Sequence, residues 1–264
     1  MTATTAASSG RRSDLAIRSV TGVSLILIAI ACLIYGQDPF WLLLSIATLV
    51  MMAEWASLIH AERWQMWLAF VGLTLPLFLE QPHLDVPNAA AWYALGATTL
   101  CIGAFTRNAR LGAGMLYSGL PVLSLFYLHG QYDGIDLSFW TLAVVWATDI
   151  GAYFSGRIIG GPKLAPQWSP NKTWAGLIGG MIAATLIGFG LVTVLHVQPR
   201  LAALSGLLAI AAQVGDLFES VMKRRAGVKD SGWLLPGHGG VMDRLDGVVP
   251  VLCIVALIVA SGIL

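Results

Sequence analysis

The chain has 264 residues, of which 57% are hydrophobic and 11% charged, and its formal net charge is +1. Soluble domains carry about 25% charged residues, and this chain has too little polar surface to cover a soluble core. With a mean hydropathy of +0.76, the composition excludes an ordinary soluble protein and predicts an integral membrane protein. We expect no nucleic-acid partner. The three cysteines each stand alone in an apolar run, as small core residues do, and not as metal ligands or disulfides.

Long apolar runs recur along the whole chain, and a membrane-spanning helix needs about 20 mostly apolar residues. We therefore predict an all-α fold, a polytopic membrane bundle of about nine transmembrane helices. The predicted spans are 17–36, 39–60, 64–80, 88–106, 111–130, 137–157, 173–195, 201–222 and 247–264. Residues 1–16 are expected to form a flexible cytoplasmic N-terminus.

The loop charges predict the orientation of these spans. With a cytoplasmic N-terminus, every Lys and Arg except Arg200 falls on the cytoplasmic side, whereas the outer loops carry acids. This asymmetry follows the positive-inside rule. It places the two longest inner loops, 157–172 and 223–246, in the cytoplasm, where a water-soluble substrate would meet the protein.

Acidic residues lie inside two of the predicted spans: Asp149 in the sixth, and Asp216 and Glu219 in the eighth. An ionised acid in a bilayer costs a few kcal/mol, so it normally faces a cavity, an ion or a cation. The structural alternative is a salt bridge or a helix hydrogen bond. Glu54 lies close to the inner end of the second span, and we expect its side chain to reach water.

One helical face of the eighth span carries residues spaced i, i+3, i+4 and i+7, namely Asp216, Glu219, Ser220 and Lys223. Asp243 and Asp246 are spaced i, i+3 if the ninth helix begins there. Carboxylates from the two helices would then converge on one hard cation. Oxygen ligands of this kind suit Mg²⁺, and no cluster of His and Cys in the sequence indicates zinc.

Basic residues and glycines accompany these acids in the inner loops. The bases are Lys172, Lys223, Arg224, Lys229 and Arg244. The positive-inside rule explains a basic run, but not its interleaving with Asp230, Asp243 and Asp246. A metal–phosphate site needs such a mixture, because acids hold the metal, bases neutralise phosphate and glycine admits backbone N–H groups. In the other loop, Ser169 or Asn171 is expected to cap the following helix, whose N-terminus favours anions.

Residues 220–246 read SVMKRRAGVKDSGWLLPGHGGVMDRLD, which closely resembles the signature of phosphatidate cytidylyltransferases, also called CDP-diacylglycerol synthases. The matching positions are Ser220, Lys223, Arg224, Lys229, Asp230, Gly232, Leu235, Pro236, His238, Gly239, Gly240, Asp243, Arg244 and Asp246. Upstream, the chain also resembles this family at Asp149, Ala152, Tyr153, Gly156, Ser169, Pro170, Lys172 and Thr173. The chain departs from the family pattern at Ala175, where an acid is usual, and at Gly247, where Ser is common.

The resemblance implies a membrane nucleotidyltransferase that joins CTP to phosphatidic acid, giving CDP-diacylglycerol and pyrophosphate for phospholipid biosynthesis. It also implies Mg²⁺, often with K⁺ as a second ion, and a homodimer in the lipid bilayer. We expect the bacterial inner membrane, with the active site at the cytoplasmic face. On this reading residues 137–264 form the catalytic part, and 17–130 a scaffold or dimerisation part.

The resemblance also assigns roles by motif position. Metal binding falls to Asp216, Asp243 and Asp246. The catalytic set is Lys223, Lys229, Asp230, His238 and Arg244. The substrate-binding set is Ser169, Asn171, Lys172, Thr173, Arg224, Gly239 and Gly240. Asp149, Glu219 and Ser220 are expected to lie beside them.

Three alternatives remain open. A CTP-dependent lipid kinase of the polyprenol or phytol type would share the nucleotide site but transfer the γ-phosphate, so its products would be CDP and a phospholipid. An ion-coupled transporter would explain the intramembrane acids but not the basic, glycine-rich inner loop. A non-catalytic membrane scaffold would tolerate neutral substitution of the charged residues between 229 and 247.

Overall fold

The computed structural model describes residues 22–87, 89–234 and 239–263, and most of them are helical. Within these ranges, four helices are long and apolar enough to cross a membrane, by length and composition: α2 (Gln37–Leu58), α5 (Ala109–His129), α6 (Gly134–Ile158) and α7 (Trp174–Val192). Shorter apolar helices are Gly22–Tyr35, α4 (Ala89–Phe105) and α11 (Val248–Ser261). The remaining helices are α3 (Arg63–Leu79), α8 (Pro199–Ala202), α9 (Ser205–Arg225) and α10 (Met242–Leu245).

These bounds lie within a few residues of the predicted spans, because local signals end the apolar runs. The turn after α2 contains His60 in a left-handed conformation, with φ of 53°. A capping box between Glu62 and Gln65 then begins α3. The eighth predicted span is divided into α8 and α9. The predicted N-terminus 1–16 and the start of the first span lie outside the described residues.

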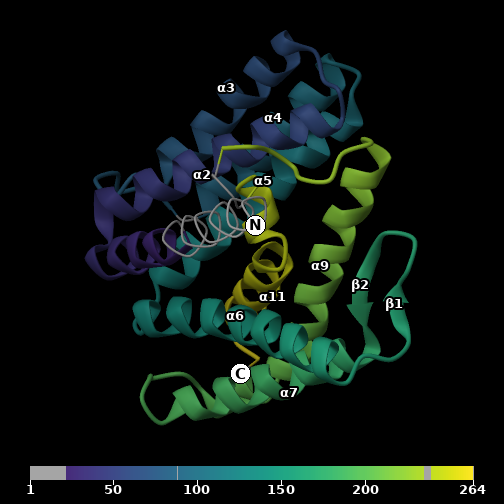
Figure 1. Ribbon diagram of the computed structural model, residues 1–264. Coiled ribbons are helices and arrows are strands. Elements are labelled where there is room, and N and C mark those ends of the chain that lie inside the picture. Colours follow the sequence, from purple (N-terminus) through teal and green to yellow (C-terminus); the bar gives the residue numbers. More distant parts are fainter. Residues whose placement is uncertain (1–21, 88, 235–238, 264) are drawn as a thin grey trace, which may run out of the picture.

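The helices form two groups that share the central helix α11 (Figure 1). One buried cluster joins α2, α3, α4 and α5, and it includes the fully buried Met242 of α10. The other joins α5, α6, α9 and α11 around the buried Trp140. The segment after α9 therefore leaves the second group and inserts a side chain into the core of the first.

Helices α6 and α7 run side by side in close contact (Figure 1). The indole N–H of Trp140 on α6 donates to the carbonyl of Gly188 on α7 at 3.0 Å. At the other end of the pair, a Cβ added to Gly151 would lie 2.8 Å from the carbonyl oxygen of Gly179. Small residues at the contact therefore let the two backbones approach, as in other membrane helix pairs.

Between α6 and α7 the chain forms an antiparallel hairpin of β1 (Lys163–Ala165) and β2 (Ser169–Thr173). The sequence predicted an inner loop here. It also predicted that Ser169 or Asn171 caps α7, and this was wrong. Because β2 stays extended to its end, the cap is Thr173, whose hydroxyl oxygen accepts from the amide three residues later at 3.0 Å.

Replacement of Gly151 by alanine is expected to destabilise the fold. The new methyl group would meet the Cβ of Ala183 as well as the backbone of Gly179, so the two helices must separate. Overpacking of this kind costs about 1–3 kcal/mol, and thermal melting in detergent should show a lower midpoint. The matched control is Gly190→Ala on α7, where an added Cβ meets nothing within 4 Å. Equal melting temperatures for the two variants would contradict the packing argument.

Candidate active site

The acid–base face predicted for the eighth span is present on α9. The hydroxyl of Ser220 lies 3.4 Å from Asp216 Oδ1, one helical turn away. The ammonium of Lys223 lies 3.5 Å from Glu219 Oε1, also one turn away. The four residues therefore share a face, with the acids toward the middle of the helix and the base at its end.

An ion pair connects the hairpin to this face. Lys172 Nζ on β2 lies 2.5 Å from Asp216 Oδ2 on α9, and only 15% of the lysine side chain is exposed. Figure 1 shows the hairpin lying alongside α9. Burying the ammonium would be unfavourable without a counter-charge, so this pair brings together two of the segments that the sequence marked as functional.

A second ion pair, together with backbone donors, fixes the segment after α9. Lys223 Nζ lies 2.5 Å from Asp243 Oδ1. Asp243 Oδ2 accepts from the amides of Ser231 at 2.9 Å and Gly240 at 2.8 Å. Burial alone would raise the pKa of Asp243, but Lys223 and these backbone donors hold it below its ordinary value. Asp243 is thus held ionised by its own loop and by α9.

Glu54 does not reach water as the sequence suggested; that expectation was wrong. Its residue is 7% exposed, and its carboxylate accepts three hydrogen bonds from the segment after α9. The donors are the hydroxyl of Ser231 at 2.9 Å and the amides of Val241 and Met242, both at 2.8 Å. The segment folds back over the end of α2 and replaces water as the partner of the carboxylate.

The remaining carboxylates lie close to one another. Asp246 follows α10 and accepts from the amide of Gly247 at 2.7 Å. Burial, and then the nearby carboxylate of Asp216, raise the pKa of Asp246 to about 6. Glu219 has 0% exposure, and among the described residues no donor makes a hydrogen bond to either of its carboxylate oxygens. Carboxyl groups of Asp216, Glu219 and Asp246 are therefore gathered beside Lys172 and Lys223.

Such a gathering of oxygen atoms is of the kind that a hard cation binds, although the described residues show no ready-made ligand cluster. Within the described part of the chain, no three His, Cys, Asp or Glu side chains are grouped as metal ligands. Asp243 contacts Lys223 and Ser231, whereas Asp246 accepts from the amide of Gly247. The buried Glu219 oxygens beside Asp246 are the feature that a hard cation would satisfy.

The other predicted site residues are placed around this centre. Exposed among them are Asp149, Asn171, Arg224, Lys229, Asp230 and Arg244, and Ser169 and Gly239 are half-buried. Arg224 donates to the carbonyl of Val228 at 3.1 Å, which closes the turn after α9. His238 lies outside the described residues, so its predicted role stays a prediction.

Two contributors were missed by the sequence analysis. Glu54 carried a signal, since it is an acid in an apolar helix, but its partner is 187 residues away from it. Ser231 carried no signal beyond its place in the motif. Its hydroxyl lies 2.9 Å from both Glu54 Oε2 and Asp243 Oδ2, and so it joins the two buried carboxylates.

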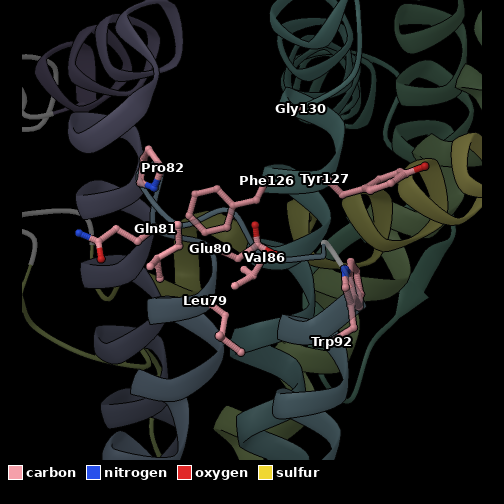
Figure 2. A pocket seen from close by; sticks show the side chains of 10 residues that line it. Leu79, Glu80, Gln81, Pro82, Val86, Trp92, Phe126, Tyr127 and Gly130 are labelled. Carbon is pink, nitrogen blue, oxygen red and sulfur yellow. The ribbon is translucent and has the colours of Figure 1, made fainter.

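A cavity of about 350 Å³ lies away from this site, at the opposite ends of α3 and α5. Figure 2 shows Glu80 near the middle of its lining side chains, beside Phe126 and Val86. Burial raises the pKa of Glu80 from 4.5 to about 7. None of the residues assigned to catalysis lines this cavity, which lies among α3, α4 and α5.

Comparison with known proteins gives a consistent result. A family model described as "Cytidylyltransferase family" matches residues 16–261. The chain is 31% identical over 274 residues to a phosphatidate cytidylyltransferase of Haemophilus influenzae, covering 86% of this chain and 92% of that protein. It is 31% identical over 248 residues to one of Staphylococcus haemolyticus, covering 89% and 95%. A phosphatidate cytidylyltransferase of Brucella suis is 54% identical over 141 residues, about half (52%) of each chain.

The Glu80 carboxyl should make stability depend on pH. Its pKa is 4.5 in the unfolded chain and about 7 in the fold, so its favourable contribution is fully present below pH 4.5 and is lost as pH rises through 7. Glu80→Gln should therefore raise the melting temperature, relative to the parent, more at pH 8 than at pH 5. The exposed Asp85 provides a control, and Asp85→Asn should show no such trend. A pH-independent effect of Glu80→Gln would contradict the assignment.

Proposed function

Because the chain belongs to the cytidylyltransferase family, we propose that it transfers CMP from CTP to phosphatidic acid, giving CDP-diacylglycerol and pyrophosphate. One observation carries the proposal: relatives named phosphatidate cytidylyltransferase align with at least 86% of this chain. The paired acids and bases of α9, β2 and the segment after α9 support it, because they suit the binding of phosphates. The match to the Brucella suis relative spans about half of each chain.

The reaction requires two anionic substrates to approach each other. An oxygen of the phosphatidate phosphate attacks the α-phosphorus of CTP. A new P–O bond forms, the bond from the α-phosphorus to the oxygen bridging the β-phosphate breaks, and pyrophosphate leaves with that electron pair. The attacking oxygen is already anionic and needs no strong base, so positioning and charge neutralisation carry the catalysis.

The basic residues of the site neutralise the substrate charge in this proposal. Lys172 and Lys223 are each held by an acid at 2.5 Å, so their ammonium groups are fixed before substrate arrives. Lys229 and Arg244 are exposed and accessible to a nucleotide from the water. Asp230 and His238 are proposed to orient these bases.

The remaining substrate contacts are assigned by motif position. The hairpin residues Ser169, Asn171 and Thr173 are proposed to contribute to the nucleotide site, together with Arg224. Gly239, which has a φ of 79°, and Gly240 are proposed to present backbone N–H groups to phosphate. In the described structure the Gly240 amide donates to Asp243, so its contact with substrate would require that bond to exchange.

Mg²⁺ is proposed as the cofactor, with K⁺ as a second ion. The proposed ligands are Asp216, Asp243 and Asp246, and the unsatisfied oxygens of Glu219 support a cation beside them. Asp243 would have to exchange its contact with Lys223 to join the set. A bound Mg²⁺ would supply neutralising charge to the phosphates and stabilise the leaving pyrophosphate.

The proposed setting is the bacterial inner membrane, with about nine spans, a cytoplasmic N-terminus and the site at the cytoplasmic face. The distribution of Lys and Arg over the loops supports this orientation. Phosphatidate keeps its acyl chains in the bilayer and its phosphate at the interface, whereas CTP arrives from the water. A site at helix ends beside the inner loops meets both substrates. The proposed homodimer rests on the family resemblance.

The purified protein should release pyrophosphate from CTP only when phosphatidate and Mg²⁺ are both present. Pyrophosphate and the lipid product are measured together, so that the alternatives are separated in one assay. CDP with a newly phosphorylated lipid would indicate a kinase. Uptake into proteoliposomes without a need for CTP would indicate a transporter. Either result, or no turnover at all in the presence of both substrates, would refute the proposal.

Asp246→Asn should lower the rate by about 10²–10³-fold, as expected when a well-placed charged group of a catalytic site is lost. The substitution conserves size and removes a carboxylate whose charge interacts with that of Asp216. Asp38→Asn, an exposed change at the start of α2, is the control and should keep the parent rate. Steady-state pyrophosphate release measures both. Parent-like turnover by Asp246→Asn would exclude Asp246 as a metal ligand.

A further inference from the structure

The carboxylate of Glu54 joins the two groups of helices at the proposed active site. Glu54 lies in the last turns of α2, whereas its hydrogen-bond donors Ser231, Val241 and Met242 lie in the segment between α9 and α11. Neither the sequence motif nor the roles proposed above give Glu54 a part in the reaction.

The Glu54 carboxylate, which belongs to α2, caps the N-terminus of α10. Val241 is the N-cap of α10 and Met242 its first residue, and the first amides of a helix have no acceptor within the helix. Glu54 Oε1 and Oε2 accept from these two amides, both at 2.8 Å. A buried amide without an acceptor is unfavourable, so the start of α10 depends on α2.

Local packing leaves this arrangement little freedom. A Cβ on Gly240 would collide with the Ser231 hydroxyl and the Glu54 carboxylate, and one on Gly232 would lie 2.7 Å from Glu54 Oε1. Met242, with 0% exposure, is packed in the core formed by α2, α3, α4 and α5. The glycines of the motif therefore let the backbone reach a buried carboxylate.

From Glu54 a continuous set of contacts leads to a proposed phosphate-binding base. The Ser231 hydroxyl lies 2.9 Å from both Glu54 Oε2 and Asp243 Oδ2. Asp243 in turn holds Lys223 Nζ at 2.5 Å. The position of the Lys223 ammonium is thus determined partly by an acid on α2.

We propose that Glu54 is a positioning residue for the transfer reaction, and that α2 thereby contributes to the active site through Ser231 and residues 239–243. Glu54 does not touch substrate in this proposal. It orders the start of α10 and, through Ser231, the pair of Asp243 and Lys223. This inference rests on the proposed function, since it assigns Lys223 to the phosphates.

Glutamine cannot replace Glu54 in this role. An amide has one acceptor oxygen, whereas the amides of Val241 and Met242 donate to different oxygens of the carboxylate. In either orientation of the glutamine, one buried backbone N–H would face the NH₂ group and remain unsatisfied. Glu54→Gln therefore conserves size but removes the cap.

The experiment compares the parent with Glu54→Gln, Ser231→Ala and Leu73→Ala in the full chain. A substitution far from the reacting atoms can lower the rate about 10²-fold if it displaces the catalytic groups slightly. We expect a fall in kcat of this order for Glu54→Gln. Ser231→Ala keeps both amide bonds to Glu54, so its loss should be smaller. Leu73→Ala opens the same buried core of α2, α3, α4 and α5 without touching the carboxylate, and controls for lost stability.

Hydrogen exchange provides a measurement that does not depend on activity. In Glu54→Gln, exchange should accelerate in peptides covering residues 231–245 and stay at the parent rate in α6 and α7. Leu73→Ala should lower the melting temperature without this local change and should keep the parent kcat below its melting transition.

Two results would overturn the inference: parent-like kcat in Glu54→Gln, or a loss of kcat that Leu73→Ala reproduces at equal loss of melting temperature. If the parent itself releases no pyrophosphate, the proposed function fails. The exchange result then decides by itself whether Glu54 orders the segment.

Discussion

Charge buried in an apolar helical bundle must be paired, and the arrangement of this molecule follows from that constraint. An unpaired buried carboxylate or ammonium is far more unfavourable than a hydrogen-bonded one. Lys172 and Lys223 each meet an acid at 2.5 Å, and Glu54 meets three donors. In each case the partners come from different elements, so satisfying the charges also fixes the hairpin, α9 and α10 relative to one another.

One acid is less completely paired, and it lies at the proposed centre of chemistry. Glu219 has no exposed surface and no hydrogen-bond donor among the described residues, with Lys223 at 3.5 Å as its nearest cation. Groups left unsatisfied in a buried site are often those that a substrate or ion completes. The surrounding pairs hold the bases in place in advance, which reduces the reorganisation needed when phosphates bind.

The sequence predicted the helices well and the long-range contacts poorly, for physical reasons. Apolar run length and turn residues act locally, so α2, α6 and α7 begin and end close to the expected positions. The shared face of α9 also followed from helical spacing. The partners of Glu54 did not, because a segment 187 residues away supplies them and no periodic pattern encodes that distance. The shared cation-binding role expected of Asp243 and Asp246 stays a prediction, and in the described structure each acid meets different partners.

The contact between α2 and the segment before α11 also has a consequence for the order in which the protein is assembled. Synthesis proceeds from the N-terminus, so α2 is complete long before residues 231–242 leave the ribosome. During that interval Glu54 lacks the three donors that it meets in the folded chain, and the arrival of the late segment supplies them. Completion of the proposed site is therefore a late step of assembly, because it requires α2, which is made early, to bind a segment that is made near the end of synthesis.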